Sequence, residues 1–310
     1  MANLLLYGTT VLIWGSTWLA ISYQIGIVDP ALSVFYRYAA AALLLFAWCR
    51  LRGRPLHYAL GDHGIFALLG LTLFSLNFVL VYQSQAYVSS AVAAIVFASL
   101  LWMNILNSRL FFGTPIEPRG VAGSLLGVAG LALILAPQLG DLSWNDATFF
   151  GGLLCVAGTL VASLGNMLSQ RAQRRALPVL QTNAWGMFYG ALLTLTYALV
   201  SGVELAFDAS PRYLLSLGFL VIFGSIVGFG AYLTLLGRIG AHRAGYVTIL
   251  FPVVAVLLSV AFEDLVLDQQ SFAGIALVLG GNLLALGLKS FRSGRSLQKS
   301  QAAPAMTKAC

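Results

Sequence analysis

Apolar segments of about 20 residues, enough to cross a bilayer as helices, alternate along this chain with short loops whose charge changes sign from loop to loop. Of the 17 Lys and Arg residues, 14 fall on one side of the membrane implied by this alternation, and eight of the ten Asp and Glu residues fall on the other. Cytoplasmic loops carry an excess of Lys and Arg. The sequence therefore predicts an all-α, multi-pass membrane protein with both ends in the cytoplasm. The basic residues are Arg50, Arg52, Arg54, Arg109, Arg119, Arg171, Arg174, Arg175, Arg238, Arg243, Lys289, Arg292, Arg295 and Lys299, and the acidic ones are Asp29, Asp141, Asp146, Glu204, Asp208, Glu263, Asp264 and Asp268.

The composition favours a membrane protein and argues against a nucleic-acid-binding one. Hydrophobic residues make up 59% of the chain and charged residues 9%, whereas charged residues are about 25% of a soluble domain. The net charge of +7 is scattered over short loops and the tail. Such a distribution orients a chain in the lipid bilayer and does not form a surface for a polyanion.

Ten segments are apolar and long enough to cross about 30 Å of hydrocarbon. The long polar stretch 137–148 falls near the middle of them. We therefore predict a first five-helix repeat over 1–140, a second over 141–290, and a disordered cytoplasmic tail over 291–310. The predicted spans are 4–22, 32–49, 64–83, 87–108, 120–136, 149–169, 181–201, 213–234, 244–262 and 271–289.

Loops at corresponding positions of the two halves carry opposite charge. An odd number of helices per repeat turns the second copy over, so its loops must exchange sign with those of the first. Inverted repeats of this kind are a transporter plan, with the substrate site near the membrane midplane where the repeats meet. The corresponding pairs are the loop at Asp29 with Arg171–Arg175, Arg50–Arg54 with Glu204–Asp208, and Arg109–Arg119 with Glu263–Asp268.

Arg37 is the one unambiguous charge inside a predicted span. A charge in hydrocarbon is costly and must face protein or a water-filled cavity, which makes it a functional candidate. Two roles stay open for it. It contacts a substrate carboxylate, or it has a structural role by snorkelling outward or bonding backbone carbonyls.

Aromatic and amide side chains inside the spans are candidates for a substrate cavity, because such a cavity needs apolar walls and a few placed polar groups. Lipid-facing or interfacial placement is the competing interpretation for the aromatic residues, whereas a buried amide needs a partner inside the bundle. Pro252 is predicted to be a hinge in the ninth span, because proline removes an intrahelical hydrogen bond. The predicted cavity-lining residues are Trp14, Arg37, Asn77, Tyr82, Trp102, Asn166, Trp185, Tyr189 and Tyr246.

Small residues recur at four-residue spacing in several spans, as in Gly123-x₃-Gly127 and Gly186-x₃-Gly190. Such faces let helices approach closely, either within the bundle or at a sliding or dimer interface. The fifth and tenth spans are rich in glycine and poor in polar side chains. We therefore expect them to pack against neighbours and to stay out of the cavity.

Motifs for enzymatic or cofactor chemistry are missing from the sequence. It contains no GxxxxGK[ST] loop for ATP and no His, Cys, Asp or Glu cluster with metal-ligand spacing. No carboxylate lies in the middle of a predicted span, and no Ser/His or Asp/Asp pair is visible for an intramembrane enzyme. We predict no catalytic residue, no metal and no cofactor.

The arrangement resembles the drug/metabolite transporter superfamily and its ten-helix EamA-type members. The similar features are Trp14-Gly15-Ser16, Arg37, Glu117-Pro118 before a glycine-rich fifth span, and Phe251-Pro252 running to Glu263. The resemblance covers residues 4–290. The first half departs from the pattern, with Trp102 where a proline is expected and Gly113 where an acidic residue is expected.

This resemblance implies a bacterial inner-membrane exporter of a small-molecule substrate, an amino acid or related compound, working by alternating access. Within the family, the chain looks most similar to the aromatic amino-acid exporters of the YddG type. The alternatives are export of threonine or homoserine, transport of a nucleotide-sugar-like anion, and an intramembrane enzyme. A bulky anion would require more cationic side chains than Arg37 alone.

Overall fold

The computed structural model describes residues 2–24, 28–84, 87, 96–134, 146–262 and 269–286, and every regular element in these ranges is helical. The first-half helices are α1 (Ala2–Ser22), α2 (Pro30–Leu51), α3 (Leu60–Leu71), α4 (Asn77–Ser84), α6 (Leu100–Phe112) and α7 (Pro118–Ile134). The second-half helices are α9 (Asp146–Arg174), α10 (Val179–Val200), α11 (Pro211–Phe219), α12 (Gly228–Ile239), α13 (Ala241–Ala244), α14 (Val247–Phe262) and α15 (Gln269–Leu286).

Five continuous helical stretches are long and apolar enough to cross a membrane, which supports a multi-pass membrane protein. They are Ala2–Ile21, Pro30–Leu51, Leu60–Ser84, Ala147–Arg174 and Pro211–Ile239. Shorter apolar helices run over Val96–Phe112 and Pro118–Ile134. The count of ten spans and the cytoplasmic position of both ends stay predictions. The boundary at 140/141, the acidic loop 263–268 and the tail 291–310 lie outside the described residues.

Local sequence signals set several helix ends. The Asp29 carboxylate accepts a hydrogen bond from the Ala31 N–H at 2.7 Å, and Pro30 occupies the first turn of α2. The Ser210 hydroxyl caps α11 by accepting from the Tyr213 N–H at 3.3 Å. Both caps satisfy N–H groups that the first turn of a helix leaves unpaired. α6 ends at Gly113 with φ +66°, a left-handed conformation that favours glycine.

A π-helical segment interrupts one long helix in each half. η1 (Thr72–Leu76) joins α3 to α4, and η2 (Leu220–Val227) joins α11 to α12. The two segments are about 150 residues apart, the spacing at which the halves correspond. Short π-helical segments are uncommon and often lie at functional sites, so their repetition at matching positions directs attention to the side chains around them.

Helix contacts obey the same correspondence between the halves. α4 packs on α9 as α12 packs on α1, α6 packs on α9 as α14 packs on α1, and η1 packs on α10 as η2 packs on α2. Two further pairs, α2 with α10 and α7 with α15, join an element to its own counterpart. This is the pattern of contacts expected from two structural repeats that meet along a shared interface.

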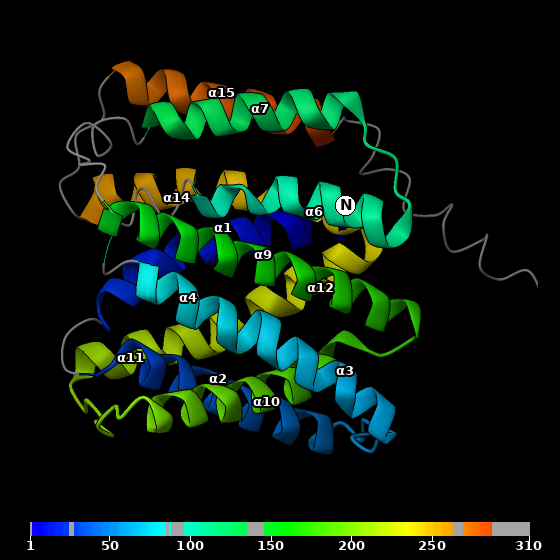
Figure 1. The fold of residues 1–310 in the computed structure, drawn as a ribbon, viewed down its shortest axis with the longest axis vertical. Coiled ribbons are helices and arrows are strands. Elements are labelled where there is room, and N and C mark those ends of the chain that lie inside the picture. The colour runs from blue at the N-terminus through cyan, green and yellow to red at the C-terminus, as the bar shows by residue number, and fades with distance from the viewer. Residues whose placement is uncertain are drawn as a thin grey trace, which may run out of the picture.

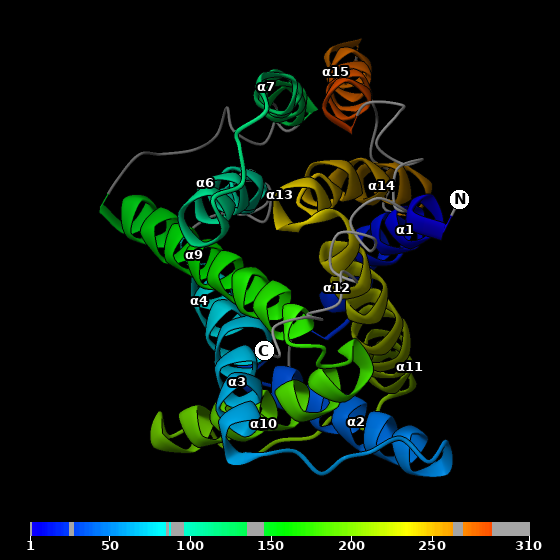
Figure 2. The same cartoon turned by 90° about the vertical axis from the view of Figure 1, so that its right-hand side faces the viewer.

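The helices run side by side in a stack (Figure 1), with the pair α7–α15 at one end and α2, α3 and α10 at the other. The view in Figure 2 keeps this order, with α6, α13, α14 and α1 next to the α7–α15 pair. α9, α4 and α12 therefore lie between the two ends of the molecule.

Glycines at helix contacts bring backbones together inside the bundle. A Cβ at Gly281 of α15 would lie 2.4 Å from the Gly123 carbonyl oxygen of α7, and a Cβ at Gly70 of α3 would lie 2.7 Å from the Gly190 backbone nitrogen of α10. Any larger residue would push these helices apart. The predicted glycine faces thus act in packing within the bundle.

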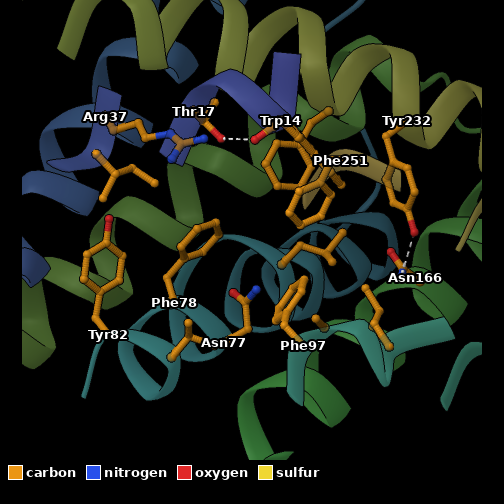
Figure 3. Close-up of a pocket in the computed structure, with 16 residues that line it drawn as sticks. Trp14, Thr17, Arg37, Asn77, Phe78, Tyr82, Phe97, Asn166, Tyr232 and Phe251 are labelled. Carbon is orange, nitrogen blue, oxygen red and sulfur yellow. Dashed lines mark hydrogen bonds between the residues drawn. The ribbon is translucent and has the colours of Figure 1, made fainter. Parts of the chain in front are cut away.

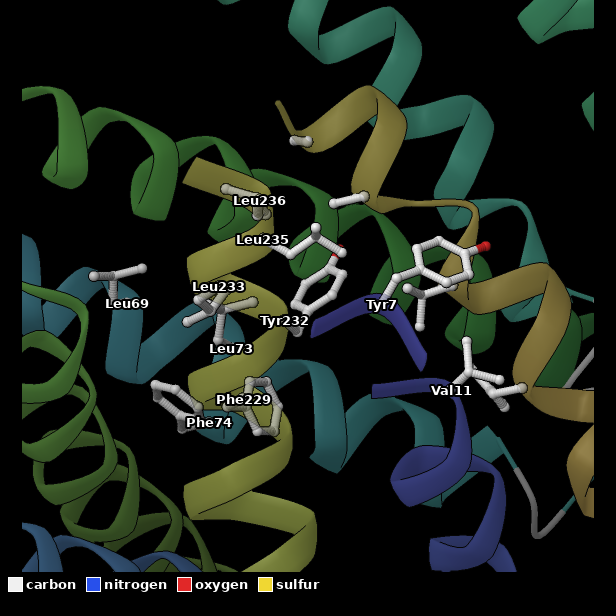
Figure 4. Close-up of a cluster of buried hydrophobic side chains, with 14 of the residues drawn as sticks. Tyr7, Val11, Leu69, Leu73, Phe74, Phe229, Tyr232, Leu233, Leu235 and Leu236 are labelled. Carbon is white, nitrogen blue, oxygen red and sulfur yellow. The ribbon is translucent and has the colours of Figure 1, made fainter. Parts of the chain in front are cut away.

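Aromatic rings fill the core between the two halves (Figure 4). The Phe74 ring of η1 lies edge-on to the Phe229 ring of α12, with centroids 5.0 Å apart. The centroid of the Tyr38 ring of α2 lies 5.2 Å from that of Phe74. All three side chains are buried. Edge-to-face aromatic pairs add roughly 0.5–1.5 kcal/mol to the energy of burial, so this cluster fixes the region beside the cavity described below.

Candidate functional site

A cavity opens between the two halves near the π-helical segments (Figure 3). Its volume, measured to the centres of the water molecules that fit in it, is about 130 Å³. A single water needs roughly 10–15 Å³ by this measure, so the space suits a molecule of about amino-acid size. The lining is Trp14, Thr17, Ile21, Arg37, Leu73, Asn77, Phe78, Val81, Tyr82, Phe97, Leu100, Ala162, Asn166, Phe229, Tyr232 and Phe251.

Helices from both halves supply this lining. It comes from α1, α2, η1, α4, 96–100, α9, α12 and α14. α7 and α15 contribute no lining residue, as their sequences led us to expect. α10 contributes none either, although Trp185 and Tyr189 of this helix were predicted to line the cavity.

Arg37 lies at the cavity wall and is 5% exposed. Its Nε donates a hydrogen bond to the Ser225 hydroxyl of η2 at 2.7 Å, and the guanidinium carbon lies 5.6 Å from the centroid of the Phe78 ring. A Cβ at Gly224 would lie 3.1 Å from Nη2, so the glycine leaves room for the guanidinium. Arg37 makes no ion pair with any carboxylate that the structure describes. The predicted burial against polar protein groups is thus observed, and a positive charge faces the cavity without a described carboxylate beside it.

Trp14 completes the same end of the cavity. Its indole N–H donates to the Gly224 carbonyl oxygen at 3.4 Å, and its ring lies 5.1 Å from that of Phe229 and 4.8 Å from that of Tyr232, between centroids. A Cβ at Gly228 would lie 2.8 Å from the indole nitrogen. The four-residue glycine spacing at Gly224 and Gly228 therefore accommodates Trp14 and Arg37.

A hydrogen-bonded network surrounds Asn166 at the cavity wall. The Asn166 amide donates to the Asn104 side-chain oxygen at 3.2 Å and to the Tyr232 hydroxyl at 3.0 Å. Ser163 also donates to that Asn104 oxygen, at 2.9 Å. These bonds tie α9 to α6 and α12. The Asn166 nitrogen thus has partners inside the bundle, whereas its side-chain oxygen accepts no hydrogen bond from the residues that the structure describes.

Asn77 differs from Asn166 in its surroundings. It stands where η1 gives way to α4, lines the cavity, and is 6% exposed. Its side-chain oxygen is buried and accepts no hydrogen bond from the residues that the structure describes. A buried polar atom without a partner is costly, and it therefore marks a position where a ligand can contribute the missing donor.

The structure brings Trp14, Arg37, Asn77, Tyr82 and Asn166 together at the cavity. The other four predicted lining residues, Trp102, Trp185, Tyr189 and Tyr246, do not line it. Trp102 is half-buried on α6.

Trp185 and Tyr189 both lie on α10, which packs against α2 and α3. The Trp185 indole donates to the Leu56 carbonyl oxygen at 3.2 Å, and the Tyr189 hydroxyl lies 2.9 Å from His63 Nδ1. These bonds hold the two side chains at the packing surface between α10 and α3, away from the cavity.

Tyr246 belongs to a second, small cluster at the junction of α13 with α7. Its hydroxyl donates to the Gly120 carbonyl oxygen at 2.7 Å, and Arg243 forms an ion pair with Glu117 at 2.5 Å. His242 lies in the same cluster. Burial, followed by the nearby Arg243 charge, lowers the pKa of His242 to about 4. The imidazole is therefore neutral at physiological pH.

Pro252 lies inside α14 and is buried, next to the cavity-lining Phe251. The Phe251 carbonyl oxygen would lie 2.9 Å from a Cβ at Gly15, so α1 and α14 approach closely here. The role of Pro252 as a hinge stays a prediction. Its counterpart Trp102 lies in α6, which continues without interruption through that position.

Several lining residues were missed, although their spacing carries a signal. Phe229 and Tyr232 are three apart on α12, and the lining residues of α1 repeat at three and four residues. Residues at this spacing share one helix face. A search for such faces around Trp14 and Asn166 would have found Thr17, Ile21 and Ala162.

The cavity offers one cation, a few amides and hydroxyls, and extensive aromatic surface. Among the residues that the structure describes, no group of three His, Cys, Asp or Glu side chains is arranged to hold a metal ion. Apolar walls with few polar groups suit the binding of an amphipathic small molecule.

Comparison with known proteins agrees with this architecture. The family model described as the EamA-like transporter family matches residues 2–136 and again residues 149–287. The "uncharacterized inner membrane transporter YedA" of Escherichia coli K12 is 28% identical over 273 residues, covering 86% of this chain and 85% of YedA. An "uncharacterized transporter" of Buchnera aphidicola is 23% identical over 258 residues, covering 83% of this chain and 85% of that protein.

A crystal structure with 22% sequence identity shares the fold, with a TM-score of 0.78 over 94% of this chain and 98% of the other. The two family matches together span nearly the whole chain, one in each half. The chain therefore belongs to the EamA-like transporter family and is a multi-pass transporter of the bacterial inner membrane.

Proposed function

We propose that this protein exports aromatic and other hydrophobic amino acids across the inner membrane by alternating access. The substrate occupies the cavity between the halves 1–140 and 141–290, and the halves rock about it to expose it to either side in turn. Walls from both halves surround the cavity, and this arrangement supports the mechanism. The general assignment, a membrane transporter of small metabolites, follows from membership of the family.

The observation that carries the proposal is Arg37. Its guanidinium faces an aromatic cavity and forms no ion pair with a described carboxylate. A carboxylate is the natural partner for a guanidinium, since the two groups form charge-assisted and often bidentate hydrogen bonds. The rings of Trp14, Phe78 and Phe229 are placed to contact an apolar side chain attached to that carboxylate.

The competing cargoes fit this lining less well. A nucleotide sugar or sugar phosphate brings two or more negative charges, whereas Arg37 is the one Lys or Arg residue among the described residues of the lining. Threonine and homoserine carry the required carboxylate, but their short polar side chains would leave the aromatic surface uncovered. An intramembrane enzyme needs a catalytic pair or a metal at the cavity, and the part of the lining that the structure describes contains no acidic residue, histidine, cysteine or serine.

Flux into proteoliposomes tests the proposal. Phenylalanine, tryptophan, threonine and glucose 6-phosphate are supplied in parallel, with protein-free liposomes as the control. We expect phenylalanine and tryptophan to be carried faster than threonine, and glucose 6-phosphate to remain at the background rate. Carriage of the phosphate compound alone would overturn the proposal. Equal rates for threonine and tryptophan would show that the aromatic residues serve packing and not recognition.

A further inference from the structure

The lining contains two amide side chains, Asn77 and Asn166, and neither side-chain oxygen accepts a hydrogen bond from a described residue. Asn77 is 6% exposed, lines the cavity, and its oxygen accepts no hydrogen bond from any described residue. Burial of an amide oxygen without a donor destabilises the protein unless something supplies one. In Figure 3, Asn77 rises from α4 between Phe78 and Phe97, on the wall across from Arg37 and Trp14.

The other amide of the lining is less free to respond to a ligand. Asn166 is fixed through its nitrogen to Asn104 and Tyr232, so its orientation is set by the contact between α9, α6 and α12. The Asn77 side chain has no such hydrogen bond to a neighbouring helix among the residues that the structure describes. Of the two amides, Asn77 is therefore the one that a substrate can orient.

The charges of an amino acid define what Asn77 can bind. An α-amino acid carries a carboxylate, which Arg37 is placed to receive, and an ammonium group with three N–H donors. The described lining contains no carboxylate to neutralise that ammonium. A neutral amide oxygen can accept one of its hydrogen bonds, and the adjacent Phe78 ring can contribute a cation–π contact.

We propose that Asn77 is a specificity-determining residue that binds the substrate ammonium, opposite the carboxylate site at Arg37. The inference rests on the proposed function and deepens it. The two residues together select zwitterions, so aromatic acids without an amine and aromatic amines without a carboxylate are poor ligands. A site built to hydrogen-bond a polar group discriminates against analogues that lack the group, because its own buried atom is then left without a partner.

Three ligands that share a phenyl ring separate the two sites. L-phenylalanine has both charged groups, 3-phenylpropanoate has only the carboxylate, and 2-phenylethylamine has only the ammonium. Binding of each to the purified full-length protein in lipid nanodiscs is measured by calorimetry at pH 7.4. The wild-type protein is expected to bind L-phenylalanine at least about tenfold more tightly than either analogue, since hydrogen bonds to charged groups are among the stronger ones.

Asn77→Leu removes the acceptor while nearly preserving side-chain volume. We expect this variant to bind L-phenylalanine about tenfold more weakly and to bind 3-phenylpropanoate with unchanged affinity, so that the preference for the amino acid disappears. Asn77→Asp keeps the shape of the side chain and adds a negative charge. This variant is expected to bind 2-phenylethylamine more tightly and 3-phenylpropanoate more weakly than the wild type does. It provides a second test should the leucine variant not fold.

Asn183→Leu is the matched control. Asn183 is also a buried amide whose oxygen has no described partner, but it lies on α10, which does not line the cavity. This variant should keep the wild-type ratio of L-phenylalanine to 3-phenylpropanoate affinity. The ratio is insensitive to a loss of folded protein, because both ligands report on the same folded fraction.

The outcomes distinguish the inference from the function it rests on. If the wild-type protein prefers L-phenylalanine and Asn77→Leu keeps that preference, the function stands and Asn77 does not bind the amine. If Asn77→Leu lowers the affinities for L-phenylalanine and 3-phenylpropanoate equally, Asn77 shapes the cavity and does not bind the ammonium group. If the wild-type protein binds none of the three ligands, the proposed function fails and this inference fails with it.

Discussion

Arg37 carries a positive charge at the cavity wall, where no described carboxylate pairs with it, and the Ser225 hydroxyl holds the guanidinium in position through Nε. Ser225→Ala keeps the charge but removes the acceptor of that hydrogen bond. We expect the KM for phenylalanine to rise about tenfold, because bonds to charged groups are worth roughly 1.5–3 kcal/mol. Ser216→Ala is the control, since the Ser216 hydroxyl donates to the Tyr213 carbonyl oxygen of its own helix.

Arg37→Leu tests the same residue more severely. Loss of the guanidinium should abolish carboxylate binding, so phenylalanine flux should fall to the background rate in a variant that is still inserted in the membrane. Arg37→Lys should restore only part of the flux, because a lysine keeps the charge but lacks the planar fork of donors. Wild-type expression and wild-type flux in Arg37→Leu would remove Arg37 from both its structural and its binding roles.

His242 makes stability depend on pH. Its pKa is lowered to about 4 from an ordinary value of 6.5, by burial first and by Arg243 second, with Glu117 acting in the opposite direction. The unfolded chain therefore binds a proton at this residue before the folded one does. The free energy of unfolding therefore has its full contribution from neutral His242 above pH 6.5, and this contribution is lost progressively as the pH falls towards 4.

Melting temperatures in detergent at pH 7.5, 6 and 5 measure this dependence. His242→Gln is expected to show a smaller fall in melting temperature than the wild type over this range. His57→Gln serves as the control, because His57 is exposed and should not affect the slope. A wild-type slope in His242→Gln would mean that other groups cause the acid sensitivity.

At the scale of helices, the contact between α7 and α15 depends on glycine. Gly281 faces α7 so closely that a Cβ would lie 2.4 Å from the Gly123 carbonyl oxygen, whereas its neighbour Gly280 has nothing within 4 Å of the same position. Gly281→Ala should therefore force the helices apart at a cost of about 1–3 kcal/mol. Gly280→Ala should be neutral or slightly stabilising, since alanine favours a helix over glycine.

Thermal unfolding of the two alanine variants compares adjacent positions on one helix. We expect a melting temperature several degrees lower for Gly281→Ala than for Gly280→Ala, in keeping with a cost of that size. Equal melting temperatures would show that α7 and α15 can separate freely, and the glycine contact would then contribute nothing to the stability of the fold.

Sequence periodicity predicted the helices well but not their internal geometry. Hydropathy located the segments that became α2, α9 and the other long helices, because apolar length is what the bilayer demands. It gave no sign of η1 and η2, since an extra residue in one helical turn changes the hydrogen-bond register and not the composition. η2 places Ser225 against Arg37 and Gly224 against Trp14, and so it shapes the cavity.

The sequence predicted which charged and amide side chains line the cavity, but it predicted poorly which aromatic side chains do. Arg37, Asn77 and Asn166 lie at the cavity because polar groups in a bilayer must face protein or water. Trp185 and Tyr246 satisfy their polar atoms on backbone carbonyls of Leu56 and Gly120 instead. An aromatic residue is stable facing lipid, protein or a cavity, so its presence in a span does not determine its direction.

At the scale of the whole molecule, the opposed loop charges predict that the two halves are inserted in opposite orientations. Alkaline phosphatase, which is active only outside the cytoplasm, should be active when fused after Asp146 and inactive when fused after Arg175. The fusion at Arg175 lies in a basic loop and serves as the internal control. Phosphatase activity in the reverse pattern would overturn the assignment of sides and with it the inverted repeat.

The central claim is that substrate passes through the cavity between the halves, and blocking that cavity tests it most directly. Ala162 of α9 lines the cavity, whereas Ala157 on the same helix is exposed. Phenylalanine counterflow in proteoliposomes is measured for Ala162→Phe and for Ala157→Phe, after both have been shown to be folded and inserted. The account predicts that Ala162→Phe falls to the rate of protein-free liposomes while Ala157→Phe transports like the wild type. Wild-type counterflow in Ala162→Phe would contradict it.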